Sequence, residues 1–238
     1  MKIHAGWLLL PALLTGCAQT TEVGNSVSSF EPKQLGKTDI DRVSDIHRRE
    51  IFASVRVLAE KLYRRNPQEW KKGGYASREA AIDRLLDPRT GWRLSGLGGK
   101  RATDAVLLAL SADYTGDRVA AFIAGLGDML NVAFEEKNEF FMFDELNPQK
   151  LYNSARNLEI AAWKLANARD AAGNLLLLTN EAPTPQQPAN LSFEREFGKM
   201  IGNLDLLSSM IADRGHRTIA RTSQSIATAV FLPVLAIR

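Results

Sequence analysis

The sequence is poor in the side chains that most often carry catalysis or hold a metal. Its 238 residues include one cysteine, Cys17, and three histidines, so no intrachain disulfide can form. Neither Glu-x-x-His nor His-Glu-x-x-His occurs, and the Gly-x-Ser-x-Gly motif of serine hydrolases is absent. His47 and Glu50 could bring two ligands to one helix face, but we interpret them as surface residues. We therefore expect no metal, no cofactor and no enzymatic activity.

Long apolar runs and strand patterns are lacking as well. Two apolar stretches, 7–14 and 226–237, are shorter than the roughly 20 residues that a helix needs to span a bilayer. We expect 226–237 to pack onto the domain, with a position at a membrane interface as the alternative, because its apolar residues are not confined to one helical stripe. Neither alternating strands nor sequence repeats can be identified.

Neither sign of charge is in large excess. The chain has 30 Lys and Arg against 27 Asp and Glu, a formal net charge of +3, and 45% of its residues are hydrophobic. The hydrophobic fraction is that of a globular protein with a core. The near balance of charge argues against nucleic acid as a general partner.

The N-terminal residues combine a short positive start with an apolar run that ends at the only cysteine. Lys2 precedes the apolar stretch 7–14, and Leu14, Thr15, Gly16 and Cys17 follow one another. This order resembles the lipobox of bacterial lipoproteins. The resemblance implies that residues 1–16 are a signal peptide and that Cys17 is the lipid-attachment residue. An ordinary signal peptide or a buried N-terminal helix is the alternative.

The lipobox resemblance also implies a location. In lipoproteins an aspartate after the acylated cysteine commonly favours the inner membrane, whereas Ala18 and Gln19 carry no charge here. The resemblance therefore implies an outer-membrane anchor with the chain facing the periplasm, and the periplasmic face of the inner membrane is the alternative. The expected partners are the membrane, through covalent lipid at Cys17, and an envelope protein.

The residues after the cysteine predict a tether followed by one helical domain. Residues 17–37 are rich in Thr, Ser, Gly, Gln and Asn and show no usable period, which is typical of a flexible linker. Residues 38–238 show repeated helical spacing of apolar side chains. We predict an all-α fold for them, an irregular bundle of about six to seven helices.

Capping residues indicate where the first helices begin. Thr38 and Asp41 match a capping box, and the helix they open should end at Asn66-Pro67. Ser77 and Thr103 are predicted to cap the next two helices.

The segment 117–146 is predicted to be the central helix because apolar residues recur along it at helical intervals. Gly125 and its small neighbours leave one flank almost bare, so another helix should approach it closely. Asn147-Pro148 should open the following helix, which is expected to end near Gly173.

The C-terminal part is predicted to contain a long loop and two more helices. Residues 179–190 include three prolines and little that could be buried, so they should form a loop. Ser192 is predicted to cap a helix that breaks at Gly215, and Thr218 to start a last helix toward Pro233.

Residues 91–101 form a glycine-rich segment that has to be tested as a phosphate-binding loop. Trp92, Lys100 and Arg101 lie in it, just before a predicted helix N-terminus that could attract an anion. The spacing is not that of a P-loop, and no strand precedes it. We interpret it as a connecting loop with an exposed tryptophan, and contact with an anion or partner is the alternative.

A second candidate is a polar stripe on the helix that follows Pro148. Arg156 and Glu159 share a helix face and can form an ion pair, or Arg156 can pair with a glutamate at 135, 136 or 139. A structural ion-pair network is our interpretation. An acid pair in a cleft would instead be a catalytic candidate.

These observations lead to one functional hypothesis and two alternatives. The hypothesis is an outer-membrane lipoprotein whose periplasmic domain is an interaction or structural component of the envelope. The alternatives are a carrier of a small hydrophobic ligand, bound along the glycine-rich flank of the central helix, and an unrecognised envelope hydrolase that uses Arg156 and Glu159. A filled core with exposed apolar side chains would favour the hypothesis.

Overall fold

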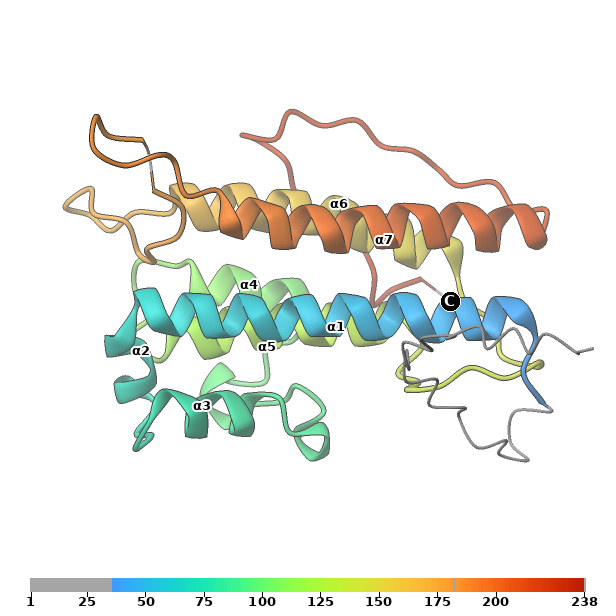
Figure 1. Cartoon of the computed structure of the whole chain (residues 1–238), viewed down its shortest axis with the longest axis horizontal. Helices are drawn as coiled ribbons and strands as arrows, with labels where there is room; N and C mark the ends of the chain where they lie inside the picture. The colour runs from blue at the N-terminus through green and yellow to red at the C-terminus, as the bar shows by residue number, and fades with distance from the viewer. Residues whose placement is uncertain (1–35, 182, 238) are drawn as a thin grey trace, which may run out of the picture. The chain divides into compact units, whose positions relative to one another are not determined.

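The computed structural model describes residues 36–181 and 183–237, which form one compact unit (Figure 1). Within these ranges the chain has seven α-helices, and the only strand-like pairing is three isolated bridges. The predicted all-α fold is confirmed. The signal peptide, Leu14, Thr15, Gly16, Cys17 and most of the predicted tether lie outside the described residues. The helices are α1 (Asp39–Arg65), α2 (Pro67–Lys72), α3 (Arg78–Leu85), α4 (Ala102–Ala109), α5 (Arg118–Ala133), α6 (Pro148–Asn167) and α7 (Ser192–Arg214).

The four longest helices form an antiparallel bundle. α1 contacts α5 and α7, and α6 contacts α5 and α7, so the four close into a ring. Figure 1 shows α1 and α7 side by side and running in opposite directions, with α6 next to α7. Successive long helices therefore alternate in direction around one core. The shorter helices α2, α3 and α4 pack on the side of the bundle that α1 and α5 form.

α5 is the central helix of the domain, since all of it except Asn131 is buried. Its bare flank receives α4, as predicted. A Cβ atom built on Gly125 would lie 2.7 Å from the carbonyl oxygen of Ala102 and 2.8 Å from Cγ2 of Val106. Glycine therefore allows the two helix backbones to approach more closely than any other residue would.

Local capping predicted three helix starts correctly. The Thr38 hydroxyl accepts a hydrogen bond from the Asp41 N–H, and the Asp41 carboxylate accepts one from the Thr38 N–H. Ser77 Oγ accepts from the Ala80 N–H, and the side chain of Asn147 caps α6. In each case the acceptor lies within three residues of the donor, so the helix start is encoded locally.

The predicted caps Thr103 and Ser192 are wrong. α4 begins at Ala102 without a cap from its own chain segment, and its first N–H donates to the buried carboxylate of Asp128 on α5. Ser192 is the first residue of α7, whose second N–H donates to the side chain of Asn180. The cap of α4 is distant in the sequence, so the start of α4 depends on tertiary packing. At α7 the first N–H donates to the nearby side chain of Asn190, and only the second reaches back to Asn180.

The predicted end of the central helix, at 146, is wrong by more than ten residues. α5 ends at Ala133, and Glu135 and Glu136 follow with φ of 54° and 55°. This left-handed conformation ends the helix and turns the chain toward α6. The residues between these helices form a loop that contacts Gly36 and the start of α1.

Two other helix boundaries differ from the prediction. α6 ends at Asn167, before the predicted end near Gly173. Asn66-Pro67 ends α1, as predicted, but Pro67 also opens the short helix α2. Proline is compatible with the first helical position because it needs no N–H partner there.

The predicted last helix, from Thr218 toward Pro233, is absent. Residues 215–237, which we name the C-terminal strap, contain no helix and run along α6 and α7 (Figure 1). Side-chain amides of α6 hydrogen-bond its backbone in place of a helix. Ala229 and Val234 are buried against the bundle, as expected for the apolar segment, whereas Val230 is 68% exposed.

The long loop predicted at 179–190 is observed. Its described residues contain no helix, and isolated bridges pair Glu181 with Asn190 and Thr184 with Gln187. Among the described helices, none has the length and apolar content required to cross a membrane.

Candidate functional site

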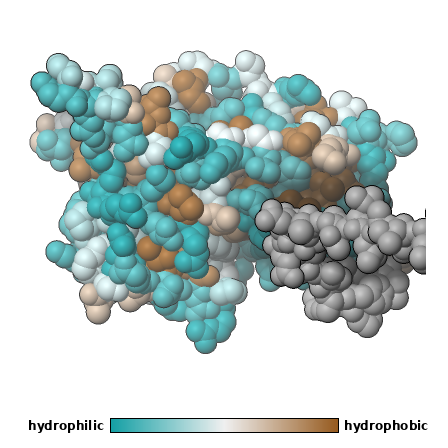
Figure 2. Space-filling model, in the orientation of Figure 1, coloured by the Kyte–Doolittle hydropathy of each residue, from teal (hydrophilic) through white to brown (hydrophobic). Residues whose placement is uncertain are grey.

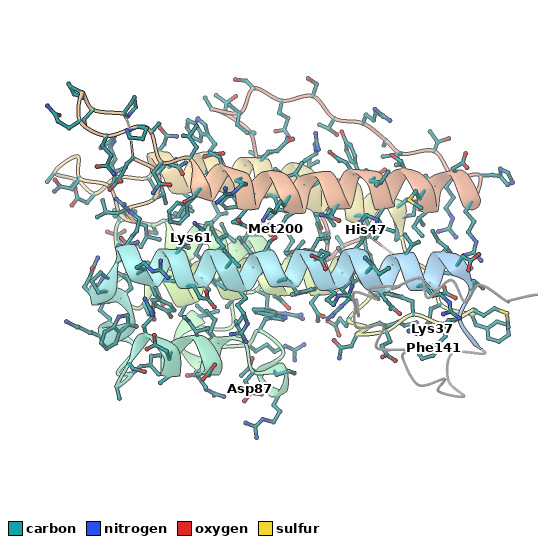
Figure 3. All side chains as sticks on the ribbon, in the orientation of Figure 1. Lys37, His47, Lys61, Asp87, Phe141 and Met200 are labelled. Atoms are coloured by element: carbon teal, nitrogen blue, oxygen red, sulfur yellow. The ribbon has the colours of Figure 1, made fainter. Side chains whose placement is uncertain are left out.

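An open cleft of about 420 Å³ lies between α1, the turn after α3 and the end of α5. Arg48, Phe52 and Arg56 line it from α1, four residues apart and therefore on one helix face. The turn contributes Asp87, which Figure 3 shows beneath α1, and Trp92. The cleft thus combines two arginines with two aromatic rings.

Two aromatic rings form one wall of the cleft. Phe52 stacks on Trp92 with ring centroids 5.7 Å apart and an interplanar angle of 26°. The six-membered ring of the indole also packs against Gly127 of α5, where a Cβ atom would lie 2.2 Å from Cε3 of Trp92. Trp92 is therefore half-buried, and the expectation of an exposed tryptophan is wrong. Its φ of 64° is unusual for a bulky residue and is imposed by these contacts.

Arg48 is held over the phenyl ring, but its hydrogen bonds are incomplete. Its Cζ lies 4.5 Å from the centroid of Phe52, and an Nη donates to Oδ1 of Asn138 at 2.7 Å. Its Nε is buried and has no hydrogen-bond partner. Burial lowers the pKa of the Arg48 guanidinium, and the nearby carboxylate of Asp45 partly offsets this effect. The residue is still a cation at neutral pH, since arginine is always charged in proteins.

The two acidic residues of the cleft form ion pairs with arginines that lie outside it. Asp87 accepts hydrogen bonds from the guanidinium and backbone N–H of Arg89, and these lower the pKa of Asp87 to about 2. Glu136 lies 3.4 Å from the guanidinium of Arg101. Arg56, in contrast, makes no ion pair or hydrogen bond with any described residue. Among the charged side chains that line the cleft, Arg56 is thus the one with no direct partner in the described part of the chain.

The structure separates the three residues predicted in the glycine-rich loop. Trp92 lies in the cleft, Lys100 is exposed, and Arg101 forms a two-point ion pair with Asp128, at 2.9 and 2.7 Å. Hydrogen bonding to Asp128 raises the pKa of Arg101. The same carboxylate accepts the Ala102 N–H at 3.1 Å. The anion at this helix N-terminus is thus the protein's own aspartate.

Arg156 and Glu159 form the centre of an ion network between α6 and α7. The guanidinium of Arg156 lies 3.0 Å from Glu159 and 2.6 Å from Asp205, and it also lies over the Tyr152 ring. Burial raises the pKa of Glu159, and Arg156 opposes this shift. Glu135, a predicted alternative partner, instead pairs with Lys150. One guanidinium thus contacts both carboxylates and ties α6 to α7, so we interpret the cluster as a structural ion-pair network.

A buried polar network at the start of α5 was not predicted from the sequence. The Tyr63 hydroxyl donates to Asp117 at 2.8 Å, and the Arg118 N–H donates to Glu69 at 2.7 Å. Burial raises the pKa of Asp117, with a further contribution from the charge of Glu69. Burial and Asp117 also raise the pKa of Tyr63. Asp117 caps α5, so we interpret the network as structural.

His47 links two helices of the bundle. Its Nδ1 lies 2.7 Å from Oδ1 of Asn203, and Figure 3 shows it between α1 and α7. An amide oxygen only accepts, so Nδ1 carries the proton. Within residues 36–181 and 183–237, no three His, Cys, Asp or Glu side chains are grouped as they would be around a metal.

The geometry thus singles out the cleft at Arg48, Phe52 and Trp92 as the candidate site. A regular spacing of four residues along α1 was the signal that could have identified its first wall. The second wall has no such signal, because Trp92 comes from a turn whose position depends on packing. The comparisons with known proteins return no match: no family model, no curated protein and no solved structure is significantly similar to the chain.

Proposed function

We propose that this chain is a lipoprotein of the bacterial cell envelope, anchored by lipid at Cys17, whose helical domain is an interaction component. The order of residues 14–17 supports the anchor, with the outer membrane as its site and the inner membrane as the alternative. Acyl chains contribute about 0.8 kcal/mol per buried CH₂, so two or three of them hold a protein firmly without a spanning helix.

One exposed apolar tip carries the interaction part of the proposal. Phe143 is 90% exposed and its neighbour Met142 is 52% exposed, in the loop between α5 and α6. Burying a phenylalanine side chain contributes about 1.5–3 kcal/mol of favourable free energy. Phe143 makes no such contribution in the isolated domain, so it is available for binding. The tip thus offers an anchor point for a partner, which we propose is an envelope protein.

The loop holds this tip in a defined position. The Met142 N–H donates to the Gly36 carbonyl at 2.9 Å, and the Phe141 N–H donates to Asp144. Asp144 also pairs with Lys137, and Figure 3 shows Phe141 beside Lys37, just before the N-terminus of α1. A tip that is already ordered loses little entropy on binding. It also lies at Gly36, where the chain from Cys17 enters the domain.

The two alternatives have less support. The flank of α5 that a hydrophobic carrier would use is filled by α4 and Trp92. Arg156 and Glu159, which the hydrolase would use, form an ion pair with each other, and Arg156 also binds Asp205.

Figure 2 shows a mainly hydrophilic face on which the hydrophobic residues lie in separate patches, as expected for a domain that stays in water.

The anchor is tested by labelling cells with radioactive palmitate. Cys17→Ser should abolish incorporation and release the chain from the membrane fraction, whereas Phe143→Ser should keep both label and membrane attachment. A Cys17→Ser chain that stays membrane-bound and is processed normally would contradict the anchor.

The interaction is tested by placing a photo-crosslinking amino acid at position 143 or at position 107. Leu107 is 46% exposed on α4 and serves as the control. We expect one discrete protein adduct at position 143 and none at position 107. Equal adducts at both positions, or lipid adducts alone, would contradict a protein contact at the tip.

A further inference from the structure

The arginine-lined cleft between α1 and the turn after α3 holds one of its charged side chains in an uncommon position. Arg48, Phe52 and Arg56 lie on one face of α1, while Ile51 and Val55 of the same helix are fully buried in the core. Basic residues on an outer helix face normally extend into water. Here Arg48 is drawn down over the Phe52 ring instead, with its Nε unpartnered.

The volume of the cleft suits a small organic molecule. At about 420 Å³ it lies within the roughly 300–1,000 Å³ typical of ligand sites. Its lining is mixed, with the stacked rings of Phe52 and Trp92 on one side and guanidinium groups beside them. A ligand that fills it must therefore be partly apolar and partly polar.

The backbone is strained where it positions the indole. Gly91 and Trp92 are consecutive left-handed residues, with φ of 54° and 64°. Strain of this kind persists only where the surroundings impose it, and it concentrates at binding sites. Gly127 leaves room for the indole, because a Cβ atom there would collide with it.

The arginines of the cleft indicate the charge of the ligand. Asp87 and Glu136, its acidic residues, are held by Arg89 and Arg101. Arg48 uses one Nη for Asn138. Guanidinium groups recognise carboxylates through paired N–H donors, so the unused donors of Arg48 and Arg56 favour an anion.

We propose that this cleft binds a small carboxylate that carries a planar apolar group, of the aromatic-acid class. The carboxylate lies between Arg48 and Arg56, and the planar group lies against the side of the Phe52–Trp92 stack that lines the cleft. Binding here is independent of the lipid anchor and of the exposed tip at Phe143.

The proposal is tested with benzoate as the probe and the ¹⁵N-labelled full chain carrying Cys17→Ser. The indole N–H resonance of Trp92, assigned with Trp92→Phe, should shift in a saturable way on addition of benzoate. Benzyl alcohol, which has the ring without the charge, and acetate, which has the charge without the ring, should each bind at least tenfold more weakly. If either binds as tightly as benzoate, the proposal is wrong.

Arginine variants locate the binding site. Arg48→Gln and Arg56→Gln should each weaken benzoate binding at least tenfold. Arg49→Gln is the matched control, because Arg49 is adjacent, 69% exposed at its side chain and outside the cleft, so it should change binding less than twofold. Equal effects of all three variants would mean non-specific attraction and would overturn the proposal.

Two additional measurements test whether a variant has lost its fold and whether any simple anion binds. Arg56 has no partner among the described residues, so Arg56→Gln should fold even if Arg48→Gln does not, and its binding result then decides. Inorganic phosphate tests for a simple anion site. Phosphate binding as tight as that of benzoate would overturn the role of the aromatic wall, and binding at least tenfold weaker would support it.

Discussion

The side-chain amide of Asn157 pairs with the backbone of Leu232 through two hydrogen bonds. Its Nδ2 donates to the Leu232 carbonyl at 2.9 Å, and its Oδ1 accepts from the Leu232 N–H at 2.7 Å. Gln149 makes the same pair of contacts with Ala220, at 3.0 and 2.8 Å. At two points of the C-terminal strap, a side-chain amide thus takes the place of a backbone partner. It satisfies the N–H and the carbonyl of one strap residue, which have no helix or strand partner.

The first prediction is that Asn157→Asp destabilises the domain by about 1–3 kcal/mol. The carboxylate cannot donate, so the carbonyl of Leu232 would face a buried charge without a hydrogen bond. Urea denaturation gives the loss, and trypsin should cut at Arg221 faster than in the wild type.

Gln68→Glu is the control for this charge change, because Gln68 is exposed on α2. It should shift the free energy of unfolding by less than about 0.5 kcal/mol. If Asn157→Asp is equally mild, the strap is not held by this amide.

The second prediction concerns the close approach of α4 to α5. Gly125→Ala should destabilise the domain by about 1–3 kcal/mol, because the added Cβ would lie 2.7 Å from the Ala102 carbonyl oxygen. Gly202→Ala on α7, where nothing lies within 4 Å, should instead stabilise by up to about 1 kcal/mol. Denaturant midpoints of the two variants must therefore move in opposite directions, and a rise for Gly125→Ala would rule out this packing.

The third prediction uses the tertiary cap of α4. Asp128→Asn should destabilise the domain by about 1–3 kcal/mol, because an amide offers one acceptor where Arg101 and the Ala102 N–H use both carboxylate oxygens. Asp104→Asn, at an exposed position in the first turn of α4, should cost less than about 1 kcal/mol. Calorimetry would measure both, and equal losses would mean that Asp128 has no special role.

The fourth prediction concerns pH. Burial raises the pKa of Asp117 above its ordinary value of 3.8, so folding favours the protonated form. The stability from this group is present below pH 3.8 and is lost as pH rises through the raised pKa. The amide of Asp117→Asn keeps one acceptor where the Ala120 N–H and the Tyr63 hydroxyl use both carboxylate oxygens, which costs stability at every pH. Relative to that of the wild type, the free energy of unfolding of Asp117→Asn should nevertheless be higher at pH 7 than at pH 4, because only the wild type has the titrating carboxyl.

Asp113→Asn is the matched control for the pH dependence, because Asp113 is exposed in the preceding turn. Its stability should follow that of the wild type at every pH. If the difference in free energy of unfolding between Asp117→Asn and the wild type is the same at pH 7 and at pH 4, the pKa of the Asp117 carboxyl is not raised by folding.

Much of the fold follows from local sequence, and some of it does not. Thr38, Ser77 and Asn147 mark helix starts because each side chain caps an N–H within three residues. The apolar spacing of α5 identified the central helix for the same reason, since helical periodicity is local. The error at its end arose because apolar spacing continues beyond Ala133, while left-handed backbone at Glu135 and Glu136 ends the helix.

The candidate site was predicted in part. Trp92 was identified from the sequence, but as an exposed loop residue. Arg48 and Phe52 were not identified, because on a long amphipathic helix an arginine stripe is indistinguishable from an ordinary solvated face. Arg156 and Glu159 do form the predicted ion pair, since residues three apart meet on any helix.

What the sequence determined by itself is therefore the local part: the all-α class, the bare flank at Gly125 and the helix starts with caps of their own. What only the tertiary structure decided involves partners distant in the chain. Asp128 caps α4, Asn157 binds the C-terminal strap to α6, and Trp92 stacks on Phe52 to form a wall of the cleft. The physical reason is that propensity and capping act within a few residues, whereas buried polar groups take whichever partner the packed fold brings to them.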